Sequence, residues 1–322
     1  MRYGSRWPLV CLLAPLPALA ATPADYPSRP IRVIVPFTAG SGPDVVARLV
    51  GQKLSEIWKQ PVVVDNRAGA AGTIAADLVA KAVPDGYTLL MASPSQVITV
   101  SLLPKLPYDF VRDLAPVSLV ASSDYSLAAN PQLPARSLRE LVALAKARPG
   151  QLTYGSSGTG TVTHLAGEQL NRQAGITLLH VPYKGAAQVI TDVMAGQISM
   201  LFNSVATLAP SVRAGKLRGI GVTAKARSPL LPEVPTFAEE GMPGFETRAW
   251  FGLLTTAGTP RGVTAKLQAE IVRMLEAPDT RERIVAMGMD PIGNTPAEFG
   301  AVIGQEIARY ARLIKDGNIR AD

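Results

Sequence analysis

The feature that most constrains the fold is a unit that recurs along the 322-residue chain: an apolar segment, a loop of small residues, and an amphipathic segment. Short, continuous apolar runs are typical of strands buried on both faces of a parallel sheet, whereas apolar residues spaced by three and four are typical of helices. A chain that alternates the two predicts an α/β fold with parallel sheets. The small-residue loops lie at 37–43, 66–72, 155–161 and 183–186.

The first of these loops indicates what the loops can do. It lies within IRVIVPFTAGSGPDVVARLV, residues 31–50, where Pro43 suits the first turn of a helix and Ser41 or Gly42 suits its cap. A helix N-terminus presents unpaired backbone N–H groups and the positive end of the helix dipole. In open parallel sheets, ligands bind beyond the carboxyl ends of the strands, where such loops lie. The loop therefore predicts a site for an anion.

The length of the chain and its proline-rich crossings predict two lobes. The segments 115–121 and 125–131 are expected as strands that leave the first lobe, and 245–260 as a pair of strands that returns to it. Each lobe is expected to be a mostly parallel sheet flanked by helices. The expected lobe boundaries are 22–123 together with 247–322 for the first lobe, and 124–246 for the second.

Local signals place the last helices. Thr295 and Glu298 have the spacing of a capping box, with a proline between them at the first helical position. Two helices are expected to close the chain, one over 261–276 and one from 295 to about 317. After a third strand at 87–93, the sequence has a proline-rich passage that ends in LPYDFVRDL, and no helix is assigned to it.

The N-terminus has the pattern of a secretory signal peptide. Two arginines precede WPLVCLLAPLPALA, which ends in the small-residue cleavage pattern Ala18-Leu19-Ala20. This apolar segment is too short to remain as a membrane-spanning anchor. Residues 1–20 are therefore expected to be removed, together with Cys11, the one cysteine of the sequence. The mature protein is expected in a bacterial periplasm, without disulfides.

Composition excludes several classes of partner. The net charge of +7 is scattered, and no basic run is interleaved with aromatic residues, so no nucleic-acid partner is expected. The sequence has two histidines, His164 and His180, and neither has metal-ligand spacing to other histidine, cysteine or acidic residues. No metal or organic cofactor is expected, and the chain is expected to be a monomer.

An enzymatic alternative remains open at this point. Ser156 and Ser157 precede His164, which suggests a nucleophile and a base, although the G-x-S-x-G elbow of α/β-hydrolases is absent. A secreted serine hydrolase using Ser157 and His164 is therefore the alternative to a binding protein. Structural roles are the preferred interpretation for both histidines.

Motifs along nearly the whole sequence carry a family resemblance. In order they are PIRVIVPFTAGSGPDVVAR, PVVVDNRAGAAG, VPDGYTLL, LPYDFVRDLAPV, YGSSGTGTVTHLAGE, HVPYKG, AGKLRGIGVT, LPEVPTFAEEGMPGF and AWFGLLTTAGTP. Together they resemble the Bug (TctC-type) solute-binding proteins of tripartite tricarboxylate transport systems, from about Tyr26 to the C-terminus.

The resemblance implies a fold, a function and partners. The fold would be a type II, Venus-flytrap periplasmic binding protein, whose two α/β lobes close on a ligand. The ligand would be a small carboxylate, which the protein delivers to the membrane permease subunits of a tripartite tricarboxylate transporter and does not transform. A sensory protein that presents its ligand to a receptor is a further alternative.

The resemblance also implies a site. One ligand carboxylate would be held by backbone amides around 39–42 and 157–160, helped by hydroxyl groups. The residues implied in ligand binding are Phe37, Thr38, Ala39, Gly40, Ser41, Gly42, Asp44, Gln96, Ser156, Ser157, Gly158, Thr159, Gly160, Thr161, His164, Tyr183, Asn203 and Trp250.

Some of these residues depart from the family pattern or allow two interpretations. Ser41 stands where the family usually has a second glycine, and Asn203 where it often has aspartate. Asn203, Gln96 and Trp250 are expected to follow or end strands and to line the distal end of the cleft. Asp44 could stabilise its own helix dipole or pair with the ammonium group of an amino-acid ligand.

Overall fold

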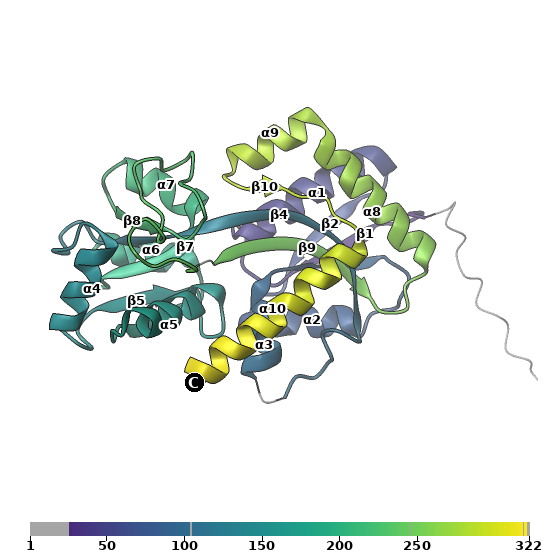
Figure 1. Ribbon diagram of the computed structural model, residues 1–322. Coiled ribbons are helices and arrows are strands. Elements are labelled where there is room, and N and C mark those ends of the chain that lie inside the picture. Colours follow the sequence, from purple (N-terminus) through teal and green to yellow (C-terminus); the bar gives the residue numbers. More distant parts are fainter. Residues whose placement is uncertain (1–25, 104, 246, 318, 321–322) are drawn as a thin grey trace, which may run out of the picture.

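The protein consists of two α/β lobes joined by long strands (Figure 1). The computed structural model describes residues 26–103, 105–245, 247–317 and 319–320. The expected signal peptide, residues 1–20, lies outside these described residues. Strand β4 (Leu114–Ala129) runs from one lobe into the other, and β9 (Arg248–Thr256) lies antiparallel to its first half. The fold class predicted from the sequence is confirmed.

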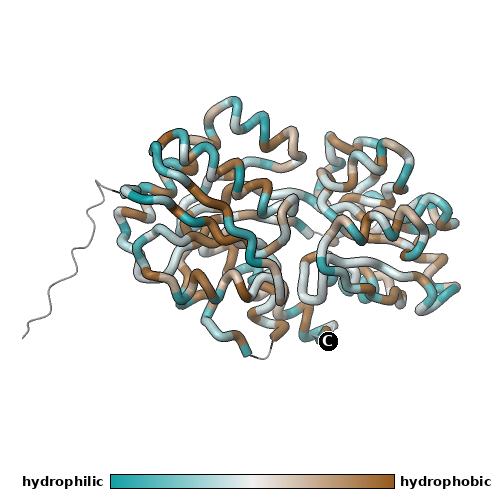
Figure 2. The backbone as a smooth tube through the Cα atoms, turned by 180° about the vertical axis from the view of Figure 1, so that it is seen from behind, coloured by the Kyte–Doolittle hydropathy of each residue, from teal (hydrophilic) through white to brown (hydrophobic). Residues whose placement is uncertain are grey.

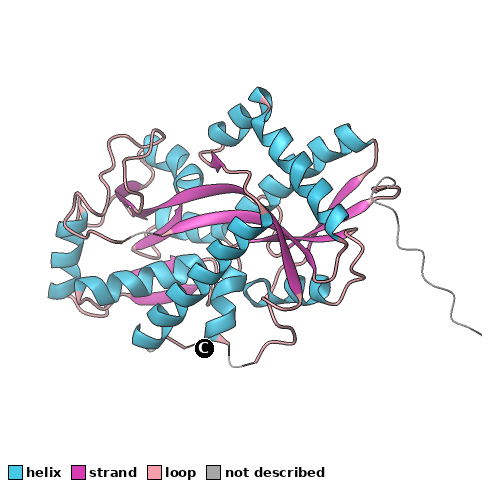
Figure 3. Ribbon diagram, turned by 45° about the vertical axis from the view of Figure 1, so that its right-hand side comes forward, coloured by secondary structure: helices cyan, strands magenta, loops and turns pink. Residues whose placement is uncertain are grey.

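One sheet runs through both lobes. Within the described residues it has ten strands, in the order β2-β1-β3-β9-β4-β7-β5-β6, with β8 and β10 also paired to β4. The neighbours of β4 and β9 are antiparallel, while the strands further out in each lobe are parallel to one another. Figure 3 shows helices on both sides of these strands.

The first lobe buries both faces of its parallel strands β1 (Ile31–Val35), β2 (Val62–Asn66) and β3 (Thr88–Ala92). In β1, Val33 packs with α1 and α8, whereas Ile34 packs with α2, α3 and α10. This explains the continuous apolar run in the sequence. The helices are α1 (Gly42–Trp58), α2 (Thr73–Ala80), α3 (Pro94–Leu102), α8 (Arg261–Glu276), α9 (Pro278–Ala286) and α10 (Pro296–Gly317).

The second lobe repeats this arrangement around β5, β6 and β7. On one face α4 and α5 cover the sheet, with Tyr154 and Phe202 in the shared core, and on the other face α6 and α7 pack on Leu201. Figure 2 shows the hydrophobic residues concentrated on the inner strands and helix faces of the lobes. The elements are α4 (Leu138–Ala147), β5 (Thr153–Ser156), α5 (Val162–Ala174), β6 (Leu179–Pro182), α6 (Ala186–Met194), β7 (Met200–Ser204), α7 (Val205–Arg213) and β8 (Arg218–Val222).

Some expected elements differ from those observed. The two crossing strands expected near 115–131 are one strand, β4, and the return pair is the single strand β9. The proline-rich passage contains α3, which opens with a capping box of Ser93 and Gln96. Its β-branched interior masks the helix, because valine, isoleucine and threonine favour strands. The described chain ends with three helices rather than two, since α9 precedes α10 and short β10 (Asp290–Pro291) lies between them.

The capping box of α10 is present as predicted. The backbone N–H of Thr295 donates to Glu298 Oε2 at 2.8 Å, and the Glu298 N–H donates to Thr295 Oγ1 at 3.2 Å. Among the described helices, none combines the length and apolar character needed to cross a bilayer.

Candidate functional site: a cavity at converging helix N-termini

A cavity of about 140 Å³ lies between the two lobes, where several helices begin. Its lining includes Tyr125 of β4 and Phe251 of β9, which connect the lobes. The helix N-termini in the lining are those of α1 (Ser41, Gly42, Pro43), α3 (Ser93, Pro94, Ser95), α5 (Thr161, Val162, Thr163), α6 (Gly185, Ala186) and α7 (Ser204, Thr207). Because each N-terminus carries a partial positive charge, their convergence favours an anion.

The charged side chains agree with this polarity. Of the described residues that line the cavity, Lys184 is the one with a charged side chain, and none is an aspartate or a glutamate. Asn203 contributes a donor as well. Its Oδ1 accepts the backbone N–H of Ser204 at 2.8 Å, and its Nδ2 group is a hydrogen-bond donor.

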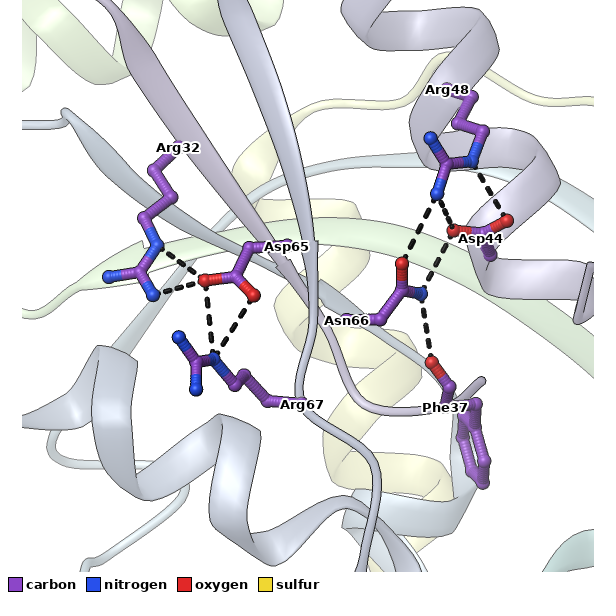
Figure 4. A network of polar contacts seen from close by, with 7 residues as sticks. All are labelled: Arg32, Phe37, Asp44, Arg48, Asp65, Asn66 and Arg67. Atoms are coloured by element: carbon purple, nitrogen blue, oxygen red, sulfur yellow. Dashed lines mark hydrogen bonds and ion pairs between the residues drawn. The ribbon is translucent and has the colours of Figure 1, made fainter. Parts of the chain in front are cut away.

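The first-lobe loop is held by a polar network behind it (Figure 4). Gly40, at φ +80°, donates its N–H to Asp44 Oδ2 at 2.9 Å. Asn66 Nδ2 bridges the Phe37 carbonyl and Asp44 Oδ1, at 2.9 Å each, and Arg48 Nε donates to Asp44 Oδ2 at 3.0 Å. These bonds hold the loop in its observed conformation.

Asp44 belongs to this network rather than to the cavity lining. Its side chain is 2% exposed. Burial by itself would raise the pKa of Asp44, but hydrogen bonds from Arg48, the Gly40 amide and Asn66 outweigh burial and lower it. Asp44 is therefore an ionised carboxylate whose oxygens already accept hydrogen bonds inside the protein.

The second-lobe loop has an equivalent structure. Gly160, at φ +79°, donates its N–H to His164 Nδ1 at 3.2 Å. Gly158, at φ +131°, donates its N–H to Ser156 Oγ at 3.1 Å, and the same Oγ lies 2.6 Å from His180 Nε2. The Thr161 N–H donates to the Gly158 carbonyl at 3.2 Å.

Several of the amides expected to hold the anion donate within the protein in this conformation. The amides of Ser157, Gly158 and Gly160 donate to side chains, as the Gly40 amide does to Asp44, and the Ser41 amide donates to the Thr38 carbonyl. Hydroxyl groups and the first helical amides remain. In particular, Ser41 lines the cavity, and its buried Oγ has no hydrogen-bond partner among the described residues.

The expected nucleophile and base do not pair. Ser157 Oγ lies 3.1 Å from Thr163 Oγ1, while His164 Nδ1 accepts the Gly160 amide. The rings of His164 and His180 stack with centroids 4.1 Å apart. Burial, together with the neighbouring His180, lowers the pKa of His164 to about 3, so its imidazole is neutral at neutral pH. A group with so low a pKa is a poor general base.

The cavity brings together only part of the expected residues. Those in its lining are Phe37, Thr38, Gly40, Ser41, Gly42, Ser157, Thr161 and Asn203. Those outside the lining are Ala39, Asp44, Gln96, Ser156, Gly158, Thr159, Gly160, His164, Tyr183 and Trp250.

The expected distal positions Gln96 and Trp250 have other surroundings. Gln96 is fully buried in α3, where Oε1 accepts the Ser93 N–H and Nε2 donates to the Ala71 carbonyl. Trp250 lines a separate cavity of about 860 Å³ and packs edge-on against Phe299. Successive side chains of a strand alternate between faces, so Trp250 and its neighbour Phe251 face opposite cavities.

Tyr183 was expected to contact the ligand, but the neighbouring Lys184 is the residue that lines the cavity. The Tyr183 hydroxyl donates to Asp192 Oδ2 at 2.6 Å, and its side chain packs with Val189 of α6. The next residue, Lys184, lines the cavity. The loop at 183–186 was thus identified from its small residues, but the choice of side chain within it needed the structure. Ser93 and Ser204, which cap helices at the cavity, were missed although serine before a helix is a recognisable signal.

The lobes already touch along one side of the cavity. Val162 and Leu165 at the start of α5 pack in one cluster with Leu102 and Phe299 of the first lobe. A Cβ at Gly160 would lie 3.0 Å from Leu102 Cδ2, which is a tight approach. The conformation is therefore one in which the two loops enclose the cavity between them.

Comparison with known proteins identifies a family for this chain. The family model described as Tripartite tricarboxylate transporter family receptor, TctC, matches residues 46–319. A UPF0065 protein from the tcbD-tcbE intergenic region of Pseudomonas sp. strain P51 is 40% identical over 298 residues, 92% of this chain and 89% of that protein.

Solved structures agree in fold. Rpa4515 of R. palustris, solved with adipate, has a TM-score of 0.87 at 34% identity, covering 92% of this chain and 99% of that one. MatC of Rhodopseudomonas palustris, solved with bound malate, has a TM-score of 0.84 at 32% identity, covering 90% and 100%. With a family match over most of its length and a cavity at converging helix N-termini, the chain belongs to the TctC family of solute-binding receptors.

Proposed function

We propose that this protein captures a small organic carboxylate in the cavity between its lobes and delivers it to the permease of a tripartite tricarboxylate transporter. The observation that carries the proposal is the convergence of the N-termini of α1, α3, α5, α6 and α7 on a cavity whose described lining has Lys184 and no acidic residue. The adipate and malate held by its relatives are ligands of this chemical class.

The head group of the ligand is placed between the two cleft loops, 37–42 and 156–161. The amides of Gly42 at the start of α1 and of Val162 and Thr163 at the start of α5 have no intrahelical partners and supply donors. The unpartnered hydroxyl of Ser41 supplies another. Hydrogen bonds to a charged group contribute about 1.5–3 kcal/mol each, so a few such donors suffice for micromolar binding.

The far end of the ligand is placed near Lys184 and Asn203 Nδ2. Both groups donate hydrogen bonds, so they fit a second carboxylate or a hydroxy acid and not an ammonium group. The cavity of about 140 Å³ is large enough to hold a small organic molecule. This matches a dicarboxylate of four to six carbons in scale, and the lining disfavours amino acids.

The remaining parts of the proposal concern the whole chain. Residues 1–20 direct export to the periplasm, and the lobes comprise 22–123 with 247–322, and 124–246. The protein works as a monomer without a cofactor and returns its ligand chemically unchanged. The buried position of His164 and its bond to the Gly160 amide support binding over hydrolysis.

The test is calorimetry of the mature protein with malate, adipate, acetate and glutamate. The two dicarboxylates are expected to bind, and a hundredfold excess over the dissociation constant should raise the unfolding free energy by about 2.7 kcal/mol. NMR of the recovered ligand should show no product. Failure of all four compounds to bind, or turnover of any, would contradict the proposal.

A matched pair of variants tests the placement of the ligand. Lys184→Met is expected to weaken adipate more than acetate, because only a dicarboxylate reaches both ends of the cavity. Lys146→Met removes an exposed charge on α4 outside the lining and serves as the control. Equal effects of the two variants on adipate would place the second carboxylate elsewhere.

A further inference from the structure

We propose that His164 and His180 are positioning residues, which hold the second cleft loop in its ligand-binding shape through one defined ring nitrogen each: Nδ1 of His164 and Nε2 of His180. This inference rests on the proposed function, since the loop is the second-lobe half of the proposed site. Neither histidine lines the cavity, so their action on a ligand is indirect.

The backbone of the second cleft loop contains two glycines whose amides are held by side chains. Gly158 and Gly160 both have positive φ, +131° and +79°. Because glycine adopts many backbone conformations, contacts are needed to hold it in one of them. The amide of each glycine donates to a side chain: Gly158 to Ser156 Oγ and Gly160 to His164 Nδ1. Side-chain acceptors therefore hold both glycine amides, in addition to the backbone bonds from Tyr183 N–H to the Ser156 carbonyl at 3.0 Å and from Thr161 N–H to the Gly158 carbonyl at 3.2 Å.

Ser156 connects the loop to His180. Its Oγ accepts the Gly158 N–H and lies 2.6 Å from His180 Nε2. A hydroxyl oxygen can do both, because it has two lone pairs and one hydrogen. His180 thus fixes the rotation of the Ser156 side chain, and Ser156 in turn fixes the Gly158 amide.

The imidazole rings of His164 and His180 pack in a column with the ring of Tyr154. His164 and His180 stack at 4.1 Å with an interplanar angle of 24°, and Tyr154 stacks on His180 at 5.0 Å and 27°. The Tyr154 hydroxyl donates to Glu168 Oε1 at 2.6 Å, which anchors the column to α5. His164 is 5% exposed and Tyr154 is fully buried, so the rings have little freedom to rotate.

The first lobe contains a bond equivalent to the one between the Gly160 amide and His164. Gly40 donates its amide to Asp44, also four residues later, and Gly40 and Gly160 have nearly equal φ of +80° and +79°. The same geometry with two different acceptors indicates that the bond itself is the feature both loops share. At the second loop, a neutral imidazole supplies the acceptor without adding another carboxylate beside the anion.

The experiment exchanges the two histidines for amides of different length. The carbonyl of asparagine can occupy the place of a histidine Nδ1, whereas glutamine reaches the place of Nε2. His164→Asn and His180→Gln are therefore expected to keep affinity for malate and adipate within about threefold. His164→Gln and His180→Asn are expected to lose more than threefold and up to about tenfold, since a hydrogen bond between neutral groups that holds the loop in shape is lost.

A second readout does not depend on a ligand. Amide hydrogen exchange at Gly158 and Gly160 is measured by NMR in the ligand-free variants, where the length-matched amides should retain protection and the mismatched ones should lose it. Gln173→Asn shortens an exposed side chain on the same helix and is the control. If the parent protein binds neither dicarboxylate, the proposed function fails, while hydrogen exchange still tests the histidines.

A different pattern of effects among the four variants would overturn the proposal. Asparagine and glutamine having the same effect at each position, on affinity and on exchange, would show that the histidines act only by packing. If a variant fails to fold by circular dichroism, ¹⁵N NMR of the parent protein decides: His164 should carry its proton on Nε2 with Nδ1 accepting. A proton on Nδ1 of His164 would refute the proposal.

Discussion

Asp44 and His164 stand at equivalent places in the two lobes, each accepting the amide of the glycine four residues earlier: Gly40 at 2.9 Å and Gly160 at 3.2 Å. One acceptor is an ionised carboxylate balanced by Arg48, and the other is a neutral imidazole. The two loops thus share a backbone shape while differing in charge. Replacing the carboxylate and replacing the imidazole should therefore have different effects on stability and on its pH dependence.

Replacing Asp44 should reduce both stability and affinity. Asp44→Ala removes the acceptor of the Gly40, Asn66 and Arg48 donors, and each hydrogen bond to a charged group contributes about 1.5–3 kcal/mol. Urea denaturation should show a loss of several kcal/mol. Asp44→Asn, which keeps a carbonyl for Gly40, should lose less. Equal losses in the two variants would contradict a role for the Gly40 bond.

Replacing Ser41 should separate affinity from stability. Its Oγ is buried without a partner among the described residues, so Ser41→Ala removes an unsatisfied polar atom. The ligand-free protein should therefore have an unchanged or slightly higher melting temperature. Affinity for malate should fall by roughly tenfold, because a donor to the carboxylate is lost. A destabilised ligand-free variant with normal affinity would show that the hydroxyl is structural.

The low pKa of His164 predicts how stability depends on pH. Burial and His180 lower this pKa from 6.5 to about 3, so between these values the unfolded chain binds a proton that the native protein does not. The contribution of the neutral imidazole is therefore complete above pH 6.5. It is lost as pH falls, by at most about 1.4 kcal/mol per pH unit.

Urea denaturation of the parent protein and His164→Asn at pH 7, 6, 5 and 4 measures this contribution. The stability of the parent protein should fall relative to that of the variant as pH falls, because the variant has no imidazole to protonate at this position. The carboxylates of the surface remain in both proteins and cancel in the comparison. Parallel profiles would mean that His164 is protonated in the native state.

Gln96 should act on stability and not on ligand preference. It is fully buried, caps α3 through the Ser93 amide and bridges to the Ala71 carbonyl. Gln96→Ala leaves these buried groups unpaired and should cost about 1–3 kcal/mol for each. The order of affinities among malate, adipate and acetate should stay the same by calorimetry. A changed order would return Gln96 to the distal end of the cleft.

Local sequence patterns predicted most of the elements and indicated a site for an anion. The alternation of apolar runs with 3.6-residue periodicity predicted β1, α1 and most later elements, because burial on one or both faces leaves a pattern in neighbouring residues. The loops of small residues predicted where helices begin at the cavity, since caps and positive φ are local requirements. The position of α3 was missed because its β-branched residues favour the wrong element.

The choice of atoms inside the site was decided by tertiary structure. Ser156 meets His180, 24 residues later, only because β5 and β6 pair in register, and that pairing occupies groups that the sequence left open as donors. Trp250 faces away from the cleft because the sheet sets which side of β9 points there. Sequence by itself determined which segments carry donors; only the fold decided which donors remain free, because a hydrogen bond between distant segments depends on how the chain brings them together.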